Sequence, residues 1–275
     1  KHALPAGPFS DSLVARLHFY MELNRWPTRA MLFNDVLFRI KTSGELKNPL
    51  RVFVSDKEHV KTYITAKIGN EHNVPTIAVL RTWEEVTNFK FPDQCCIKPT
   101  HLSGKVILRK NGEKINQAEV KEWLKTNYYQ NSRQANYKDL IPKIIVEPLL
   151  FNSTNLSDYK FFCYRGQPKM IQVDSDRQTS HQRCLFDAEW NPLPFGLHWP
   201  KPKNPPPRPR NLQSMINAAT KLSEDFEFVR IDIYTNGFEF MIGEITNCHG
   251  AGAERFIPAQ GEAIASELIF GKHTT

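Results

Sequence analysis

The sequence predicts an α+β fold, in which helices and antiparallel strands are mixed, on three observations. Stretches with apolar residues at helical spacing lie along the whole chain, and two strand–turn–strand patterns lie in its second half. The length of 275 residues, 40% of them hydrophobic, allows one large domain or two to three closely packed lobes. An aromatic content of 11% excludes disorder as the main state, and no stretch approaches the roughly 20 apolar residues of a membrane span.

The helices are predicted from apolar periodicity and from capping residues. The best-specified helix has a capping box at Ser55 and Glu58, and Gly69 ends it. A second capping box lies at Thr82 and Glu85. In chain order, the predicted helices cover residues 11–25, 55–68, a short stretch from 82, then 116–130, 211–222 and 261–270.

The strands are predicted from short apolar runs between turn residues. A first set of strands is expected at residues 76–80, 95–98, 106–109 and 143–150. Two hairpins follow, one at 159–164 and 169–173 around the turn at Arg165-Gly166-Gln167, the other at 228–234 and 238–246. The proline-dense stretch 200–209 can be neither a helix nor a central strand, so we expect a stiff surface connector.

Charge and cysteine content restrict the partners and the compartment. The charge sum is 36 − 29 = +7, which favours anionic partners without choosing among them. The five cysteines are odd in number and form no CxxC pair, so neither a disulfide framework nor a zinc ribbon is expected. With no signal-like apolar segment at the first residues, we expect a cytoplasmic protein.

The late hairpin carries the most informative side chains. Arg230 and Asp232 lie on one face of its first strand, while Ile231 and Ile233 lie on the other. An acid between buried isoleucines is costly unless it is paired or bound to a metal. Glu244 on the second strand is the natural companion of Asp232 in an oxygen site for Mg²⁺. The alternative is a simple salt bridge from Arg230 to one of the acids.

The register of this hairpin decides whether its two acids can meet. A two-residue loop at Asn236-Gly237 would place Asp232 and Glu244 on opposite faces of the sheet. A loop of odd length, or a bulge at Gly243, returns them to a shared face. We predict one of these two arrangements.

Other polar residues stand where a nucleotide could use them. Lys98 ends an apolar strand, and the small polar loop after it contains Gly104, a combination that suits a polyphosphate. The spacing is not that of a Walker A loop. Glu147 ends another buried strand at a candidate hinge, and Asp158 and Lys160 open the first late hairpin.

The order of these features resembles the ATP-grasp superfamily and, more narrowly, its TupA-like branch, which is linked with teichuronopeptide and other polysaccharide-modifying ligases. The resemblance covers about residues 50 to 270. The stretches that carry it are Asp56-Lys57 through Gly69, Asp158-Tyr159-Lys160-Phe161-Phe162, Phe228 to Tyr234, and Gly243-Glu244-Ile245-Thr246 before His249-Gly250-Ala251-Gly252.

The resemblance implies a nucleotide held between two sheets. Residues 1–55 would form an N-terminal helical segment, 56–148 a small lobe with the phosphate loop, and 149–275 a large lobe with the metal-binding hairpin. Lys98 would contact the α- and β-phosphates of ATP, and Lys57 would be a further cofactor-binding residue. The loop with His101, Ser103 and Gly104 would close over the β- and γ-phosphates.

The resemblance also implies roles for the hinge and for the first late hairpin. Glu147 and its backbone neighbours would hold the adenine. Asp158 would contact the ribose or an adjacent group, and Lys160 would reach a phosphate.

The metal and the transferring group are assigned to the last hairpin in the same way. Asp232 and Glu244 would coordinate Mg²⁺, while Arg230 would steady the transferring phosphate or an acyl phosphate. Many members of the superfamily carry Glu-x-Asn as the last metal motif, but here the third position is Thr246 and Asn247 follows it. The resemblance leaves both as alternatives for the last ligand.

The implied activity is an ATP-dependent ligase that joins a carboxylate to an amine or a thiol through an acyl phosphate. Its partners would be a small or saccharide acid, in a polysaccharide or other biosynthetic pathway, and an amine, with no nucleic acid. Arg177, Arg183 and His249 are candidates for contact with these substrates. The alternatives are a kinase built on the same nucleotide site and a non-catalytic module that binds an anionic polymer. The oligomeric state is left open.

Overall fold

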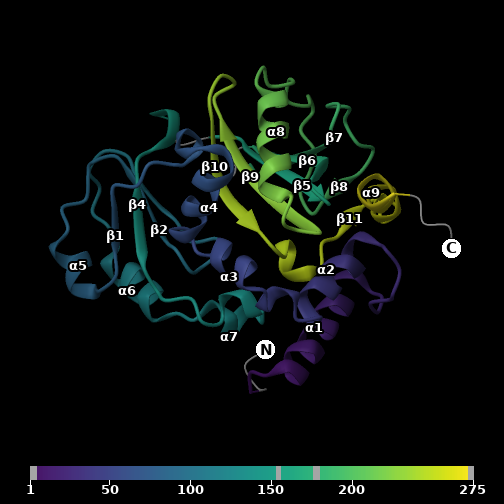
Figure 1. Ribbon diagram of the computed structural model, residues 1–275, viewed down its shortest axis with the longest axis horizontal. Coiled ribbons are helices and arrows are strands. Elements are labelled where there is room, and N and C mark those ends of the chain that lie inside the picture. Colours follow the sequence, from purple (N-terminus) through teal and green to yellow (C-terminus); the bar gives the residue numbers. More distant parts are fainter. Residues whose placement is uncertain (1–4, 153–155, 176–179, 272–275) are drawn as a thin grey trace.

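The computed structural model describes residues 5–152, 156–175 and 180–271 and has the expected α+β architecture (Figure 1). Its two main sheets are antiparallel in every pairing, one with strand order β1-β4-β2-β3 and the other with order β10-β9-β5-β6-β7. A small two-stranded sheet pairs β11 with β8. The two main sheets stand on either side of the helices α3 and α4 (Figure 1).

The helices have the following bounds: α1 Pro8–Leu23, α2 Phe33–Thr42, α3 Pro49–Ser55, α4 His59–Ile68, α5 Trp83–Asn88, α6 Gln117–Lys125, α7 Tyr128–Ser132, α8 Leu212–Ser223 and α9 Gly261–Phe270. Short 3₁₀ turns occur at Glu45–Lys47, Asn70–His72, Ala135–Tyr137, Leu150–Asn152 and His249–Gly252. The strands are β1 Ala78–Leu80, β2 Cys95–Pro99, β3 Ile107–Arg109, β4 Ile144–Glu147, β5 Asp158–Tyr164, β6 Gln167–Ser175, β7 Gln182–Asp187, β8 Gly196–Leu197, β9 Phe228–Thr235, β10 Phe240–Thr246 and β11 Phe256–Ile257.

The four-stranded sheet encloses a small hydrophobic core of its own. Buried side chains from β1, β2 and β4 pack there with residues of α5 and α6, among them Val86 and Trp123. Partly buried aromatic residues such as Phe89 and Phe91 cover the margin of this core. The residues of this sheet therefore form a compact lobe around their own apolar centre.

The five-stranded sheet has one face that is almost wholly apolar. Alternate residues of its strands, such as Phe161 and Ile231, pack there against α8 and against α3 and α4. The packing of α4 through Val60, Tyr63 and Ile64 joins residues 49–68 to this sheet. The domain boundaries expected from the sequence remain a prediction.

The other face of the five-stranded sheet is divided. Phe162 and Phe228 form one end of it with neighbouring apolar residues, and they pack against α2 and α9. The rest of this face carries charged side chains, among them Lys160, Asp232 and Glu244, and it supplies the candidate site.

Several local sequence predictions can be compared with the structure. The capping box at Thr82 is confirmed, since the Thr82 side chain accepts from the Glu85 N–H at 3.1 Å, and the helix at 261–270 has the predicted bounds. The cap of the helix after residue 55 was wrongly placed: Asp56, not Ser55, accepts from its first N–H groups. The helix predicted for 116–130 is two helices, because Asn127 interrupts it and caps the second one.

Two findings concern the membrane and the cysteines. Within the described ranges, no helix combines the length and the apolar character needed to cross a bilayer. The five cysteines, all within these ranges, carry free thiols.

Candidate functional site

A bulge at Gly243 brings the two acids of the last hairpin to the same face. The strands pair Ile242 with Ile233, and the register then shifts so that Glu244 lies opposite Asp232. This is one of the two arrangements predicted from the sequence, and it is confirmed. A side chain at Gly243 would bring its Cβ to 2.5 Å from the Tyr234 ring, so the bulge is built for glycine.

The shared face continues as a polar row across four strands. Glu244 on β10 lies opposite Asp232 on β9, which lies opposite Lys160 on β5. Lys160 in turn lies opposite Gln172 on β6. Directly opposite residues in a sheet point to the same side, so this row projects a continuous line of carboxylate, ammonium and amide groups.

Asp232 is held by cations on both sides. Arg230 donates to both carboxylate oxygens at 2.7 Å, and the Lys160 ammonium lies 3.1 Å from Oδ2. Lys160 also donates to Asp158, its neighbour on the same strand face. Burial alone would raise the pKa of Asp232, but the two cations lower it to about 2, so the group is a carboxylate at neutral pH.

The structure separates the two alternatives for the last metal ligand. The Thr246 hydroxyl lies at the site, 3.2 Å from Arg230 Nη2 and 3.3 Å from Glu244 Oε1. The Asn247 amide points the other way, where its carbonyl accepts from Arg51 at 3.0 Å and its NH₂ group donates to Ser55 at 3.1 Å. Asn247 therefore fastens β10 to α3, and Thr246 faces the acids.

A second charged cluster lies on the four-stranded sheet. Glu147 at the end of β4 contacts the Lys98 ammonium at 2.6 Å and the Lys61 ammonium at 2.7 Å. Burial opposes the charge on Glu147, but the two lysines lower its pKa, and Glu147 together with other acidic neighbours raises the pKa of Lys98 despite its burial. The Lys98 side chain is therefore charged at neutral pH.

Lys57 connects the two charged clusters. Its ammonium donates to the Leu102 carbonyl at 2.7 Å and lies 4.0 Å from Glu244 Oε2. Leu102 belongs to the loop after β2, and Glu244 belongs to the hairpin of β9 and β10. A single buried lysine therefore spans from the predicted phosphate loop to the predicted metal site.

The three loop residues predicted to meet the phosphates differ in placement. Ser103 and Gly104 are exposed at the tip, and Gly104 takes a positive φ of 72°. His101 instead is buried in the small lobe, where Nε2 donates to the Trp123 carbonyl at 3.0 Å and Nδ1 accepts from the Lys143 N–H at 3.4 Å. Burial lowers the pKa of His101, so its ring is a neutral part of the core that supports the loop from behind.

The residues predicted for substrate contact lie at the far end of the polar face. Arg183 holds Asp174 with two hydrogen bonds, at 2.6 and 3.1 Å, and lies 3.6 Å from Glu254. Glu254 lies 3.3 Å from His249 Nδ1, and burial depresses the pKa of His249 well below its usual value. These groups form a chain beside the polar row, while Arg177 lies outside the described residues.

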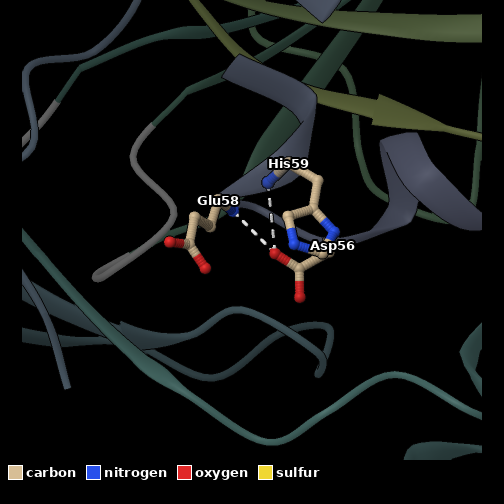
Figure 2. A group of neighbouring side chains, drawn as sticks. All are labelled: Asp56, Glu58 and His59. Atoms are coloured by element: carbon tan, nitrogen blue, oxygen red, sulfur yellow. Dashed lines mark hydrogen bonds between the residues drawn. The ribbon is translucent and has the colours of Figure 1, made fainter. Parts of the chain in front are cut away.

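Another group of side chains has the spacing of a metal site. Asp56, Glu58 and His59 place one ligand atom each within 4.8 Å of one another, and Figure 2 shows the Asp56 carboxylate accepting from the backbone N–H groups of the other two. The ammonium of Lys143 lies among them, 3.2 Å from Asp56, 2.5 Å from Glu58 and 3.4 Å from His59 Nε2. The chain itself supplies the cation here, and the cluster fastens the small lobe to the start of α4.

Sequence reasoning missed Lys61 as a member of the site. Lys61 lies one helical turn after Lys57 on the same segment, and both ammonium groups reach the other sheet. The i, i+4 spacing of the two lysines was the signal that could have found it.

The site can hold a nucleotide and a hard divalent cation. Asp232, Glu244 and Thr246 offer the oxygen ligands that Mg²⁺ prefers, and the donor set fits this ion. Lys57 and Lys98 face them from the other side with two positive charges, which suit phosphate groups.

Comparison with solved structures gives similarity to several ligases. They include D-alanine–D-alanine ligase from Helicobacter pylori, 14% identical with a TM-score of 0.39, covering 74% of this chain and 56% of that one. A D-alanine–D-alanine ligase from Bacillus anthracis complexed with ATP is 12% identical with a TM-score of 0.43, covering 80% and 63%. An L-amino acid ligase from Bacillus licheniformis is 14% identical with a TM-score of 0.46, covering 90% and 56%. The chain thus spans less than two thirds of the length of each.

The family assignment rests on the sequence of most of the chain. Residues 37–270 match the family described as TupA-like ATPgrasp. The chain therefore belongs to the TupA-like family of the ATP-grasp superfamily. The comparison with curated proteins gave no match.

Proposed function

We propose that the protein is an ATP-dependent ligase that joins a carboxylate to an amine through an acyl phosphate. The observation that carries this proposal is the meeting of Asp232 and Glu244 on one sheet face, near Lys57 before α4 and Lys98 on β2. An anionic-polymer module has no use for two acids aligned in this way, and family membership supports nucleotide chemistry.

The chain's own residues would divide the work of binding ATP. Lys98 and Lys57 would pair with its phosphates, and the exposed loop tip at Ser103 and Gly104 would fold over them. Asp232, Glu244 and Thr246 would hold Mg²⁺, which offsets charge on the phosphates when bound.

The reaction would proceed in two balanced steps. An oxygen of the acceptor carboxylate attacks the γ-phosphorus of ATP, the bond to the β-phosphate oxygen breaks, and ADP leaves. The amine then attacks the carbonyl carbon of the acyl phosphate, inorganic phosphate leaves, and a proton is released from nitrogen. Arg230 and Lys160, fixed beside Asp232, would stabilise the phosphoryl oxygens during transfer.

Water exclusion is the second task of the site. An acyl phosphate hydrolyses readily, so a closing segment must cover it before the amine arrives. The Lys57 contact with Leu102 ties the base of the loop to the site, so closure would need to move only the tip.

A thermal-shift titration with Mg-ATP tests the nucleotide site. We expect the wild type to gain stability with Mg-ATP, while Glu244→Gln and Asp232→Asn lose most of that gain. Glu239→Gln, an exposed acid of the same hairpin, is the matched control and should respond like the wild type. Equal stabilisation of both site variants and the wild type would contradict the metal assignment.

A second assay separates the ligase from the kinase. Phosphate release that requires both an acid and an amine, with an amide as product, supports the ligase. A stable phosphorylated acceptor formed without any amine would instead show a kinase. An acidic sugar or a polysaccharide precursor is the class of acid that we propose to test first.

A further inference from the structure

Helix α1 has two apolar faces, and only one of them packs against other residues that the structure describes. Its narrow inner face packs through Ala15 and Phe19, and the Phe19 ring meets Phe38 edge to face at 5.6 Å. On the outer face, Phe9 is 85% exposed and Met21 is 75% exposed. The helix lies at the periphery of the molecule (Figure 1).

The exposed side chains form one continuous stripe. At about 100° per residue, Phe9, Tyr20, Leu13, Leu17 and Met21 fall within an arc of about 120°. Trp26, which is 52% exposed, extends the stripe by stacking on Tyr20 at 4.6 Å. No residue in the described ranges covers this surface, which we call the α1 stripe.

The stripe is fixed in place before any partner arrives. Asp11 pairs with Arg133 at 3.0 Å at one end of the helix, and Arg255 donates to the Glu22 carbonyl at 3.0 Å near the other. The exposed face thus belongs to a helix anchored at both ends, and association would cost little additional ordering.

Charge favours a protein partner over an anionic membrane. The acids and bases of α1 are Asp11, Arg16, His18 and Glu22, a net charge of −1 with the histidine neutral, whereas helices that lie on anionic membranes carry a basic face. The chain as a whole is basic, but that charge is not on this helix.

Area and symmetry favour a second copy of this chain. Since a large aromatic side chain can bury roughly 150–250 Å², the six exposed side chains offer on the order of 600 Å². Two copies would together bury about 1,200 Å², the lower end of the range for specific interfaces. Two-fold pairs are the commonest assemblies, and they bring the same surface together on both subunits.

We propose that the α1 stripe is the contact surface of a symmetric homodimer with antiparallel α1 helices. Leu17 lies on the two-fold axis, Leu13 packs against Met21 of the partner subunit, and Phe9 packs near Trp26 of the partner subunit. Helix α1 precedes the segment that matches the family, residues 37–270.

Sedimentation velocity over about 1–200 μM tests the dimer. We expect the wild type to shift from monomer to dimer within this range, because an interface of this size gives modest affinity. Leu17→Glu would place two carboxylates at the axis and should remain monomeric at every concentration. Ile141→Glu, at a position that is 72% exposed and remote from α1 in the sequence, is the matched control and should dimerise.

Cross-linking tests the antiparallel register. Leu17→Cys should form a disulfide-linked dimer on mild oxidation, whereas Ile141→Cys should not. Leu13→Cys mixed with Met21→Cys should give a mixed dimer in higher yield than either variant alone.

Three results would overturn the proposal. A wild type that remains monomeric up to 200 μM contradicts it, and so does equal disruption by Leu17→Glu and Ile141→Glu. Binding of monomers to vesicles of phosphatidylcholine and phosphatidylglycerol, lost in Leu17→Glu, would assign the stripe to a membrane surface instead. The Mg-ATP stabilisation of Leu17→Glu should equal that of the wild type, so the outcome is independent of the proposed ligase activity.

Discussion

The two charged clusters of the site share one pattern and differ in surroundings. Asp232 lies between Arg230 and Lys160, and Glu147 lies between Lys98 and Lys61, so each is a buried carboxylate flanked by two cations. Only Asp232 has a second carboxylate opposite it across the strand pair.

This difference decides what each cluster can do. The side chain of Glu147 is 4% exposed and that of Glu244 is 25% exposed, so Glu244 can approach an incoming ion while Glu147 is already enclosed. With the partly exposed Glu244 beside it, the first cluster matches the proposed metal site, whereas the enclosed second cluster holds the ammonium groups of Lys98 and Lys61.

The largest effect is expected for Asp232→Asn. The change leaves Arg230 and Lys160 beside a neutral amide, and a broken buried ion pair costs about 3–5 kcal/mol. We expect this loss in urea unfolding, together with loss of the response to Mg-ATP. A variant as stable as the wild type would mean that the pair with Arg230 contributes nothing.

Glu147→Gln is expected to change the response to Mg-ATP in the opposite direction from Asp232→Asn. Two lysines lose their carboxylate, so we expect a loss of about 3 kcal/mol in the unfolding free energy. The phosphates of ATP can then replace the missing charge, so the thermal shift caused by Mg-ATP should be larger than in the wild type. A shift abolished as in Asp232→Asn would show that both clusters have the same role.

The pH dependence of the unfolding free energy measures how much the ionised Asp232 carboxylate contributes to stability. Its pKa is about 2 in the fold and about 3.9 in an unfolded chain, so the unfolded state binds more protons between these values. The stabilisation, about 2–3 kcal/mol, is therefore complete above about pH 5 and is lost as the pH falls through about 2. Urea unfolding of wild type and Asp232→Asn at several pH values should show the two stabilities converging in this window, whereas a constant difference would contradict it.

Gly243→Ala tests the bulge that creates the asymmetry. The new methyl group would meet the Tyr234 ring, so we expect a loss of about 1–3 kcal/mol and a weaker response to Mg-ATP through displaced Glu244. Gly7→Ala, at an extended and open position, is the control and should leave both measurements unchanged. If Gly243→Ala left both the stability and the response to Mg-ATP unchanged, the register of β9 and β10 would not depend on glycine at this position.

The smallest effect is expected for Thr246→Val. Loss of one weak oxygen ligand should reduce the apparent affinity for Mg²⁺ at fixed ATP several-fold, with stability changed by about 1 kcal/mol or less. Asn247→Ala should show the reverse, a stability loss with unchanged Mg²⁺ dependence, because its amide is bonded to α3. A Mg²⁺ titration of activity or thermal shift would contradict this assignment if Asn247→Ala weakened the Mg²⁺ dependence and Thr246→Val left it unchanged. Asn247 would then be the better candidate for the last metal ligand.

Much of the site follows from local rules in the sequence. The parity of strand positions required either an odd loop or a bulge before Asp232 and Glu244 could share a face, and Gly243 was the residue able to provide it. The capping box at Thr82 and the bounds of α9 also depend only on neighbouring residues.

The missed features depend on contacts between distant segments. No residue near His101 in the sequence indicates that the His101 ring is buried and bonded to the backbone carbonyl of Trp123. In the same way, the orientation of Asn247 is fixed by α3, and Lys61 on α4 pairs with Glu147 on β4 of the four-stranded sheet. Such pairings are set by the packing of the two sheets, which periodicity and spacing do not describe.

The most direct test of the paired acids is Mn²⁺ binding followed by electron paramagnetic resonance in the presence of ADP. If Asp232 and Glu244 hold one divalent ion beside the nucleotide, the wild type should bind Mn²⁺ more tightly with ADP than free ADP does, and Glu244→Gln should bind it at least about tenfold more weakly, a change of about 1.4 kcal/mol. Equal Mn²⁺ affinity in the wild type and Glu244→Gln, with both proteins still binding ADP, would contradict the account.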